Sequence, residues 1–130
     1  MVCKGVFRMK EETQVTATMD ISDFNIKTAD RSARALESGY QFKPQIICND
    51  GFKMSVQGSS GHYCSPRELS TDYYEMEVGY PSEIEPLLLP YAENKITPTE
   101  TVYGWVPCNI IDEVIVKHGG INQELTFVIK

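Results

Sequence analysis

The chain has 130 residues, of which 42% are hydrophobic, and its 12 Lys and Arg against 18 Asp and Glu give a net charge of −6. This length suits one domain with one hydrophobic core. No apolar run approaches the roughly 20 residues of a membrane helix, and the first residues lack the features of a signal peptide. We therefore expect a single cytoplasmic domain, residues 1–130.

The negative charge is concentrated in the middle of the chain. Between Glu68 and Glu100 eight acidic residues stand against one base, Lys95, which gives this segment a net charge of −7. Such a segment repels phosphates, so direct binding of nucleic acid is disfavoured. It suits a basic protein partner, although the same pattern is also typical of a solvated surface that keeps a protein soluble.

The N-terminal part, residues 1–45, is predicted to be an addition of one strand and one helix to a core formed by residues 46–130. Residues 14–21 alternate apolar and polar side chains, which favours a half-buried strand. A short helix is predicted over residues 28–38, with Thr28 as its N-cap and Gly39 just beyond its end.

A β-hairpin is predicted next. The strand-like runs "QIIC" and "FKMSVQ" are joined by Asn49, Asp50 and Gly51. An Asp-Gly pair between β-formers indicates a hairpin turn, because glycine adopts positive φ without a steric clash.

Residues 73–80, "YYEMEVGY", give the clearest strand pattern. The alternation predicts that Tyr74, Met76, Val78 and Tyr80 share one face and that Tyr74 belongs to the core. The prolines of residues 81–94 permit no more than a short helical turn. Another strand is predicted over residues 99–106.

The strongest helix pattern covers residues 109–118, with Asn109 as its cap and with Gly119 and Gly120 ending it. The run "ELTFVI" that follows predicts a closing strand. These elements predict an α+β fold: a mostly antiparallel sheet with about two helices packed on one face.

Potential metal ligands and nucleophiles occur, but their spacing is unfavourable. No two cysteines are close in sequence, so no metal is expected. Four side chains are potential zinc ligands: Cys48, His62, Cys64 and Cys108. Whether they cluster in space stays open. A Cys64–His62 pair assisted by Arg67 lacks a recognisable orienting acid, so neither an enzyme nor a cofactor is expected.

The loop Gly58–Gly61, "GSSG", offers an alternative site. Successive backbone N–H groups in such a loop can bind a phosphate, although glycine and serine are also ordinary loop residues. A nucleotide held at the interface of a homo-oligomer would contact four residues: Ser59, Ser60, Tyr63 and Arg67.

A protein-binding surface is the other candidate. Six aromatic residues lie among or near the acidic residues: Tyr63, Tyr73, Tyr80, Tyr91, Tyr103 and Trp105. Aromatic side chains surrounded by carboxylates are typical of a binding patch. The predicted partner-binding residues are Tyr73, Glu75, Glu77, Tyr80, Glu83 and Glu85.

The strings "CNDGFKMSVQ", "HYCSPRE", "YYEMEVGYPSE", "EPLLLPYAE", "TVYGWVP" and "VIVKHGGI" resemble a family of small uncharacterised proteins encoded by bacteriophages and prophages. The resemblance covers about residues 46–121. It implies a context and no assigned chemistry: small acidic phage proteins often bind a host factor, some inhibit CRISPR nucleases, and others sequester nucleotide second messengers.

The expected function is therefore a non-catalytic phage-type inhibitor that binds a bacterial defence protein of the CRISPR kind in the host cytosol. The binding surface is the acidic, Tyr-rich one. A sponge for a nucleotide second messenger and a Cys/His zinc protein or enzyme are the alternatives.

Overall fold

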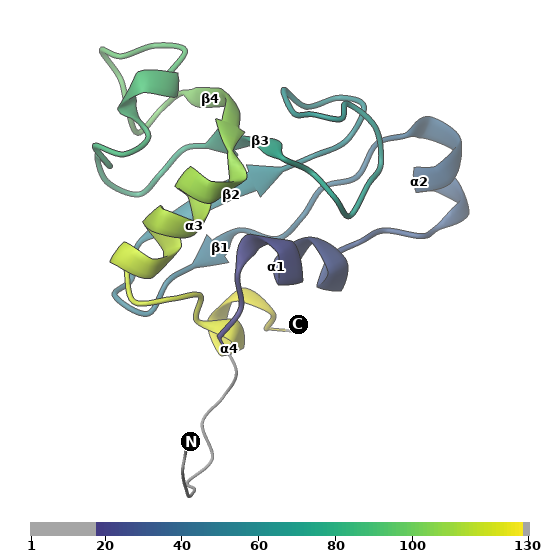
Figure 1. Cartoon of the computed structure of the whole chain (residues 1–130), viewed down its shortest axis with the longest axis horizontal. Helices are drawn as coiled ribbons and strands as arrows, with labels where there is room; N and C mark the ends of the chain where they lie inside the picture. The colour runs from purple at the N-terminus through teal and green to yellow at the C-terminus, as the bar shows by residue number, and fades with distance from the viewer. Residues whose placement is uncertain (1–17, 129–130) are drawn as a thin grey trace, which may run out of the picture.

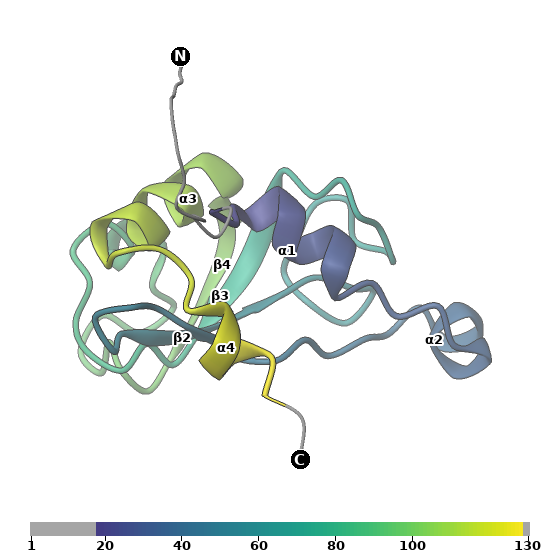
Figure 2. The same ribbon diagram turned by 90° about the horizontal axis from the view of Figure 1, so that it is seen from below.

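The computed structural model describes residues 18–128. At its centre lies an antiparallel sheet in the order β1 (Ile46–Ile47), β2 (Lys53–Gln57), β3 (Glu75–Gly79) and β4 (Val102–Pro107). Helices α1 (Ile21–Lys27) and α3 (Cys108–Lys117) lie on one face of this sheet (Figures 1 and 2). The shorter helices are α2 (Ala33–Ser38), η1 (Leu89–Tyr91) and α4 (Gln123–Thr126). The predicted α+β fold is confirmed.

One hydrophobic core joins these elements. It includes Phe24 of α1, Ile111 of α3, and the inward side chains of the strands, such as Met76 and Val78. Helix α2 stands apart from this body at one end of the molecule (Figure 2). No helix within residues 18–128 has the length and apolar character that crossing a membrane requires.

The predicted hairpin is confirmed. Ile46 pairs with Met54 and Ile47 with Lys53 in antiparallel register. Gly51 has a φ of 97°, and its N–H donates to Cys48 O at 2.9 Å. The turn therefore uses the glycine in the conformation that the sequence predicted.

The predictions for the N-terminal part are wrong for residues 18–21 and for the start of the helix that follows, and they are right for the end of that helix. Residues 14–17 of the predicted strand lie outside the described residues, and Asp20 and Ile21 begin a helix instead. Asp20 accepts from the Asp23 N–H at 2.9 Å while the Asp23 carboxylate accepts from the Asp20 N–H at 3.2 Å, a reciprocal cap that favours helix over strand. Thr28 ends α1, and Ser32 caps α2. The predicted helix end at Gly39 is confirmed by its φ of 76°.

The strand predicted over residues 73–80 is shorter in the structure. The burial of its first two tyrosines is also the opposite of the prediction. Tyr73 is buried and Tyr74 is exposed. Regular pairing begins only at Glu75, and the backbone of Tyr74 bonds to Ser65 O and to the Cys108 N–H. Strand alternation does not extend to these residues. At the other end Tyr80 is exposed, with a φ of 48°.

The C-terminal helix is confirmed, with a shifted start. Helix α3 begins at Cys108, so Asn109 lies inside the helix and does not cap it. The closing strand is wrong for residues 124–126, which belong to α4. The side chain of Asn122 accepts from the Leu125 N–H and caps this helix, while residue 129 of the predicted strand lies outside the described residues.

The buried side chain of His118 links the end of α3 to the hairpin turn by a hydrogen bond. His118 bonds through Nδ1 to Asp50 at 2.6 Å and through Nε2 to Glu85 at 2.7 Å. Its ring stacks on Phe52, with centroids 4.1 Å apart. Lys117 also pairs with Glu85 at 2.9 Å. Burial opposes the charged ring, but the hydrogen bonds with Glu85 and Asp50 outweigh it and raise the pKa of His118.

This arrangement predicts a pH-dependent contribution to stability. Because the folded pKa of His118 is raised, its contribution is full below the ordinary value of about 6.5 and is lost as the pH rises through the folded pKa. The difference in unfolding free energy between the wild type and His118→Gln should therefore be larger at pH 5.5 than at pH 8. Urea denaturation at both pH values measures it. Taking the difference removes the contribution of His62, whose pKa is lowered. A difference that is constant or grows with pH would contradict the prediction.

The buried ammonium of Lys43 donates to Thr28 Oγ1 at 2.7 Å, and burial lowers its pKa to about 8. The unfolded chain keeps this proton up to a pH of about 10.4. The unfolding free energy of the wild type minus that of Lys43→Met should therefore rise between about pH 8 and 10, and taking the difference removes the opposing contribution of Cys48 and Cys108, whose pKa values burial raises to about 11. At pH 7 the stability of Lys43→Met should be equal to or higher than that of the wild type, because Thr28 still donates to Phe24 O. Thermal or urea unfolding across this range tests both statements, and a marked loss of stability at pH 7 would contradict them.

Candidate functional site

The loop from Gly58 to Arg67 is held against the sheet by two tyrosine rings. A Cβ on Gly58 would lie 2.7 Å from the ring of Tyr73, and a Cβ on Gly61 would lie 2.9 Å from the ring of Tyr40. Both distances are shorter than real Cβ contacts allow. The glycines of "GSSG" therefore permit close packing beneath aromatic rings.

The amide groups of this loop point into the protein. The Ser60 N–H donates to Gly39 O at 2.9 Å, the Gly61 N–H to Ser59 Oγ at 3.0 Å, and the His62 N–H to Ser59 O at 3.3 Å. Ser59 is fully buried. The expected phosphate site therefore has its donors occupied by the fold, which counts against the nucleotide alternative.

His62 bonds to a serine, not to the neighbouring cysteine. Ser59 Oγ and His62 Nδ1 are 2.7 Å apart, and the His62 ring lies against the Tyr40 ring at a tilt of 31°, with centroids 5.1 Å apart. The thiol of Cys64 instead donates to the carbonyls of Ser59 and Pro66. Burial raises the pKa of this thiol and favours its protonated form, a poor nucleophile. The geometry therefore does not provide the thiolate–imidazole pair of the enzyme alternative.

The other two cysteines within residues 18–128, Cys48 and Cys108, are also held as thiols. Burial raises the pKa of Cys48 and of Cys108 to about 11 in each case. Within residues 18–128 no three His, Cys, Asp or Glu side chains come together in a way that could hold a metal ion. The zinc alternative gains no support from the described part of the chain.

A β-bulge next to this loop carries an exposed tryptophan. Met76 pairs with Val106 and Val78 with Tyr103, so Gly104 and Trp105 together face the single residue Glu77. Trp105 has a φ of 50° and an exposed fraction of 46%. A bulky residue rarely adopts positive φ, and bulges of this kind redirect side chains near functional sites.

The tryptophan belongs to a group of three side chains in which Tyr63 contacts the other two. The rings of Trp105 and Tyr63 stack with centroids 4.9 Å apart. The Arg67 guanidinium carbon lies 5.4 Å from the centroid of the Tyr63 ring. We call Trp105, Tyr63 and Arg67 the aromatic ladder. Arg67 Nε also donates to Ser60 O at 3.2 Å. Tyr63 packs beside Gly104, where an added Cβ would lie at an ordinary contact distance of 3.4 Å from Tyr63 Cβ.

Two predicted contact residues hold this ladder in position. The Glu77 carboxylate accepts from the Tyr63 N–H at 3.0 Å, and the Glu75 carboxylate accepts from Ser65 Oγ at 2.9 Å. The Trp105 N–H donates to Tyr63 O at 3.0 Å. Both glutamates are half-buried, so their main structural effect is to fix the loop on the sheet.

The other predicted contact residues divide into two groups. Tyr80 and Glu83 are exposed and stay available to a partner. Tyr73 and Glu85 are buried, because Tyr73 covers Gly58 and Glu85 bonds to His118. They are therefore inaccessible in this structure, and the surface contact predicted for them needs correction.

Sequence reasoning missed the ladder and the role of His118. Trp105 was expected only as one of several aromatic residues, and the glycine that precedes it was the available sign of a bulge. Comparison of the chain with models of protein families, with curated proteins and with solved structures gives no match.

The packing of Gly58 predicts a specific sensitivity. Gly58→Ala should destabilise the protein by about 2 kcal/mol or more, because Tyr73 is fixed by its own hydrogen bonds and cannot yield to the new methyl group. Gly79→Ala is the matched control: it lies in the neighbouring strand, with its nearest atoms at 3.8 Å. Urea denaturation of both variants compares them, and equal losses of stability would contradict the prediction.

Proposed function

We propose that this chain is a non-catalytic binding protein that inhibits a bacterial defence protein of the CRISPR kind in the host cytosol. The aromatic ladder carries this proposal. It places the residue types that dominate binding energy at protein interfaces, Trp, Tyr and Arg, in one stack. The fold holds Trp105 in a costly backbone conformation and keeps it half-exposed, which is expected of a contact residue more than of a core residue.

The charge around the middle of the chain supports a basic partner. Five of the eight acidic residues between positions 68 and 100 are exposed: Glu68, Asp72, Glu83, Glu93 and Glu100. Charged residues at the rim of an interface accelerate association and make it depend on salt. Central residues such as those of the aromatic ladder supply most of the affinity. A protein surface that normally holds nucleic acid has the complementary charge.

The defence protein as partner rests on the resemblance to phage-encoded proteins, and the ladder supports binding as such. The backbone N–H groups of the Gly58–Gly61 loop already donate to atoms of the protein, which disfavours the nucleotide alternative. The raised pKa of Cys64 favours its protonated thiol, which disfavours the enzyme alternative.

Replacing the ladder's outermost ring tests the proposal. Trp105→Ala should weaken partner binding by about 30-fold or more, the loss expected when a hot-spot residue is truncated. Tagged protein is used to retain partners from a bacterial lysate, which are identified by mass spectrometry. Affinity for the purified partner is then measured by calorimetry at two salt concentrations.

The matched control is Phe42→Ala, which removes another exposed aromatic ring that is not a member of the ladder. This variant should bind like the wild type. Both variants are checked for folding by circular dichroism. Equal retention of every partner by Trp105→Ala and the wild type would refute the proposed binding surface.

A further inference from the structure

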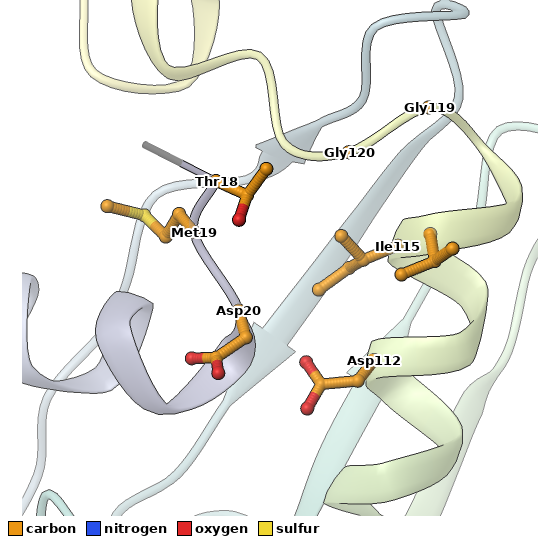
Figure 3. A pocket seen from close by; sticks show the side chains of 8 residues that line it. Thr18, Met19, Asp20, Asp112, Ile115, Gly119 and Gly120 are labelled. Carbon is orange, nitrogen blue, oxygen red and sulfur yellow. The ribbon is translucent and has the colours of Figure 1, made fainter. Parts of the chain in front are cut away.

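A groove of about 460 Å³ lies between α3 and the residues that lead into α1. Figure 3 shows Asp112 and Ile115 pointing from α3 towards the segment of Thr18 and Met19 on the opposite wall. The lining is mostly apolar, with Met19, Ile115 and Val116 as its hydrophobic side chains. Its size is in the range of grooves that bind a ligand or a peptide side chain.

The carboxylates of Asp20 and Asp112 line this groove and form no ion pair with a residue of the range 18–128. Asp112 accepts from the Ile21 N–H at 2.8 Å. Burial raises the pKa of Asp112, and the nearby charges of Asp20 and Asp23 raise it further. The ion pairs among residues 18–128 involve Glu85 and Asp50 and none of these three carboxylates. A positive charge at the rim would therefore lower the electrostatic free energy of the site.

The chain itself contains a segment of complementary chemistry. Residues 4–10, "KGVFRMK", alternate positive charge with apolar side chains: Lys4, Arg8 and Lys10 beside Val6, Phe7 and Met9. The described part of the chain begins at Thr18, which lines the groove. The residues between Phe7 and Thr18 reach up to about 35 Å when extended, so the connection is long enough to return to the groove.

We propose that residues 4–10 of this chain bind in the groove between α1 and α3. Apolar side chains of the segment lie against Met19 and Ile115, and its basic side chains lie beside Asp20 and Asp112. A short covalent tether makes this contact effectively intramolecular, at a local concentration of the order of millimolar. This contact is separate from the aromatic ladder and does not depend on the proposed function.

Disulfide trapping in the full chain tests this contact. Val116→Cys introduces a thiol on the exposed rim of the groove, and Cys3 immediately precedes the segment. Cys48 and Cys64 are buried and Cys108 is partly buried, so they compete little. Under mild oxidation an intramolecular disulfide between Cys3 and the introduced thiol should form at least about tenfold faster than in the control Ile96→Cys, whose side chain is 89% exposed.

Removing the charge complementarity gives the second measurement. In the Val116→Cys background, the triple change Lys4→Glu, Arg8→Glu and Lys10→Glu should lower the rate to that of the control. Peptide mass spectrometry identifies the linked thiols. Equal rates in Val116→Cys and Ile96→Cys, or a rate unaffected by the triple change, would overturn the proposal and leave the groove to another partner. A disulfide between two chains, with a rate that falls on dilution, would overturn it in favour of the segment of a second copy.

Discussion

The hydrogen bond from the Tyr63 N–H to the Glu77 carboxylate is the contact on which the candidate site depends. It joins a loop that has little regular structure to the middle of the sheet, at the point where the β-bulge interrupts pairing between β3 and β4. Through it the backbone of Tyr63 comes within reach of the Trp105 N–H. Because Tyr63 contacts both Trp105 and Arg67, its position determines whether the three side chains come together.

This contact also changes how the acidic composition is understood. A glutamate on the open face of a strand was expected to meet a partner directly. In the structure Glu75 and Glu77 bind the protein's own loop, and Glu85 binds His118 and Lys117. Aromatic and guanidinium groups take the exposed positions beside them. The carboxylates in β3 therefore organise the surface, and other exposed acidic residues provide its charge.

Local patterns predicted the elements whose signals are short-range. The Asp50–Gly51 turn, the strand around Met76 and Val78, and the helix ended by Gly119 follow from turn chemistry and periodicity, and all three are present. The N-terminal strand failed at residues 18–21 because the Asp20–Asp23 cap competes with alternation. The closing strand failed because the Asn122 cap starts a helical turn.

The site was less predictable than the fold. Stacking of Tyr63 on Trp105 joins residues 42 positions apart, and the bonds of His118 to Asp50 and Glu85 are equally non-local. No periodicity in one sequence encodes such contacts. The reversal of Tyr73 and Tyr74 has the same origin, because the glycine that admits the Tyr73 ring lies in a distant loop.

The most direct test of the ladder as a binding surface is photo-crosslinking in living bacteria. Benzoylphenylalanine replaces Trp105 in one variant and Phe42 in another. We expect irradiation to yield a discrete covalent adduct with a bacterial protein from position 105 and none from position 42. An adduct from position 42 with none from position 105 would contradict it.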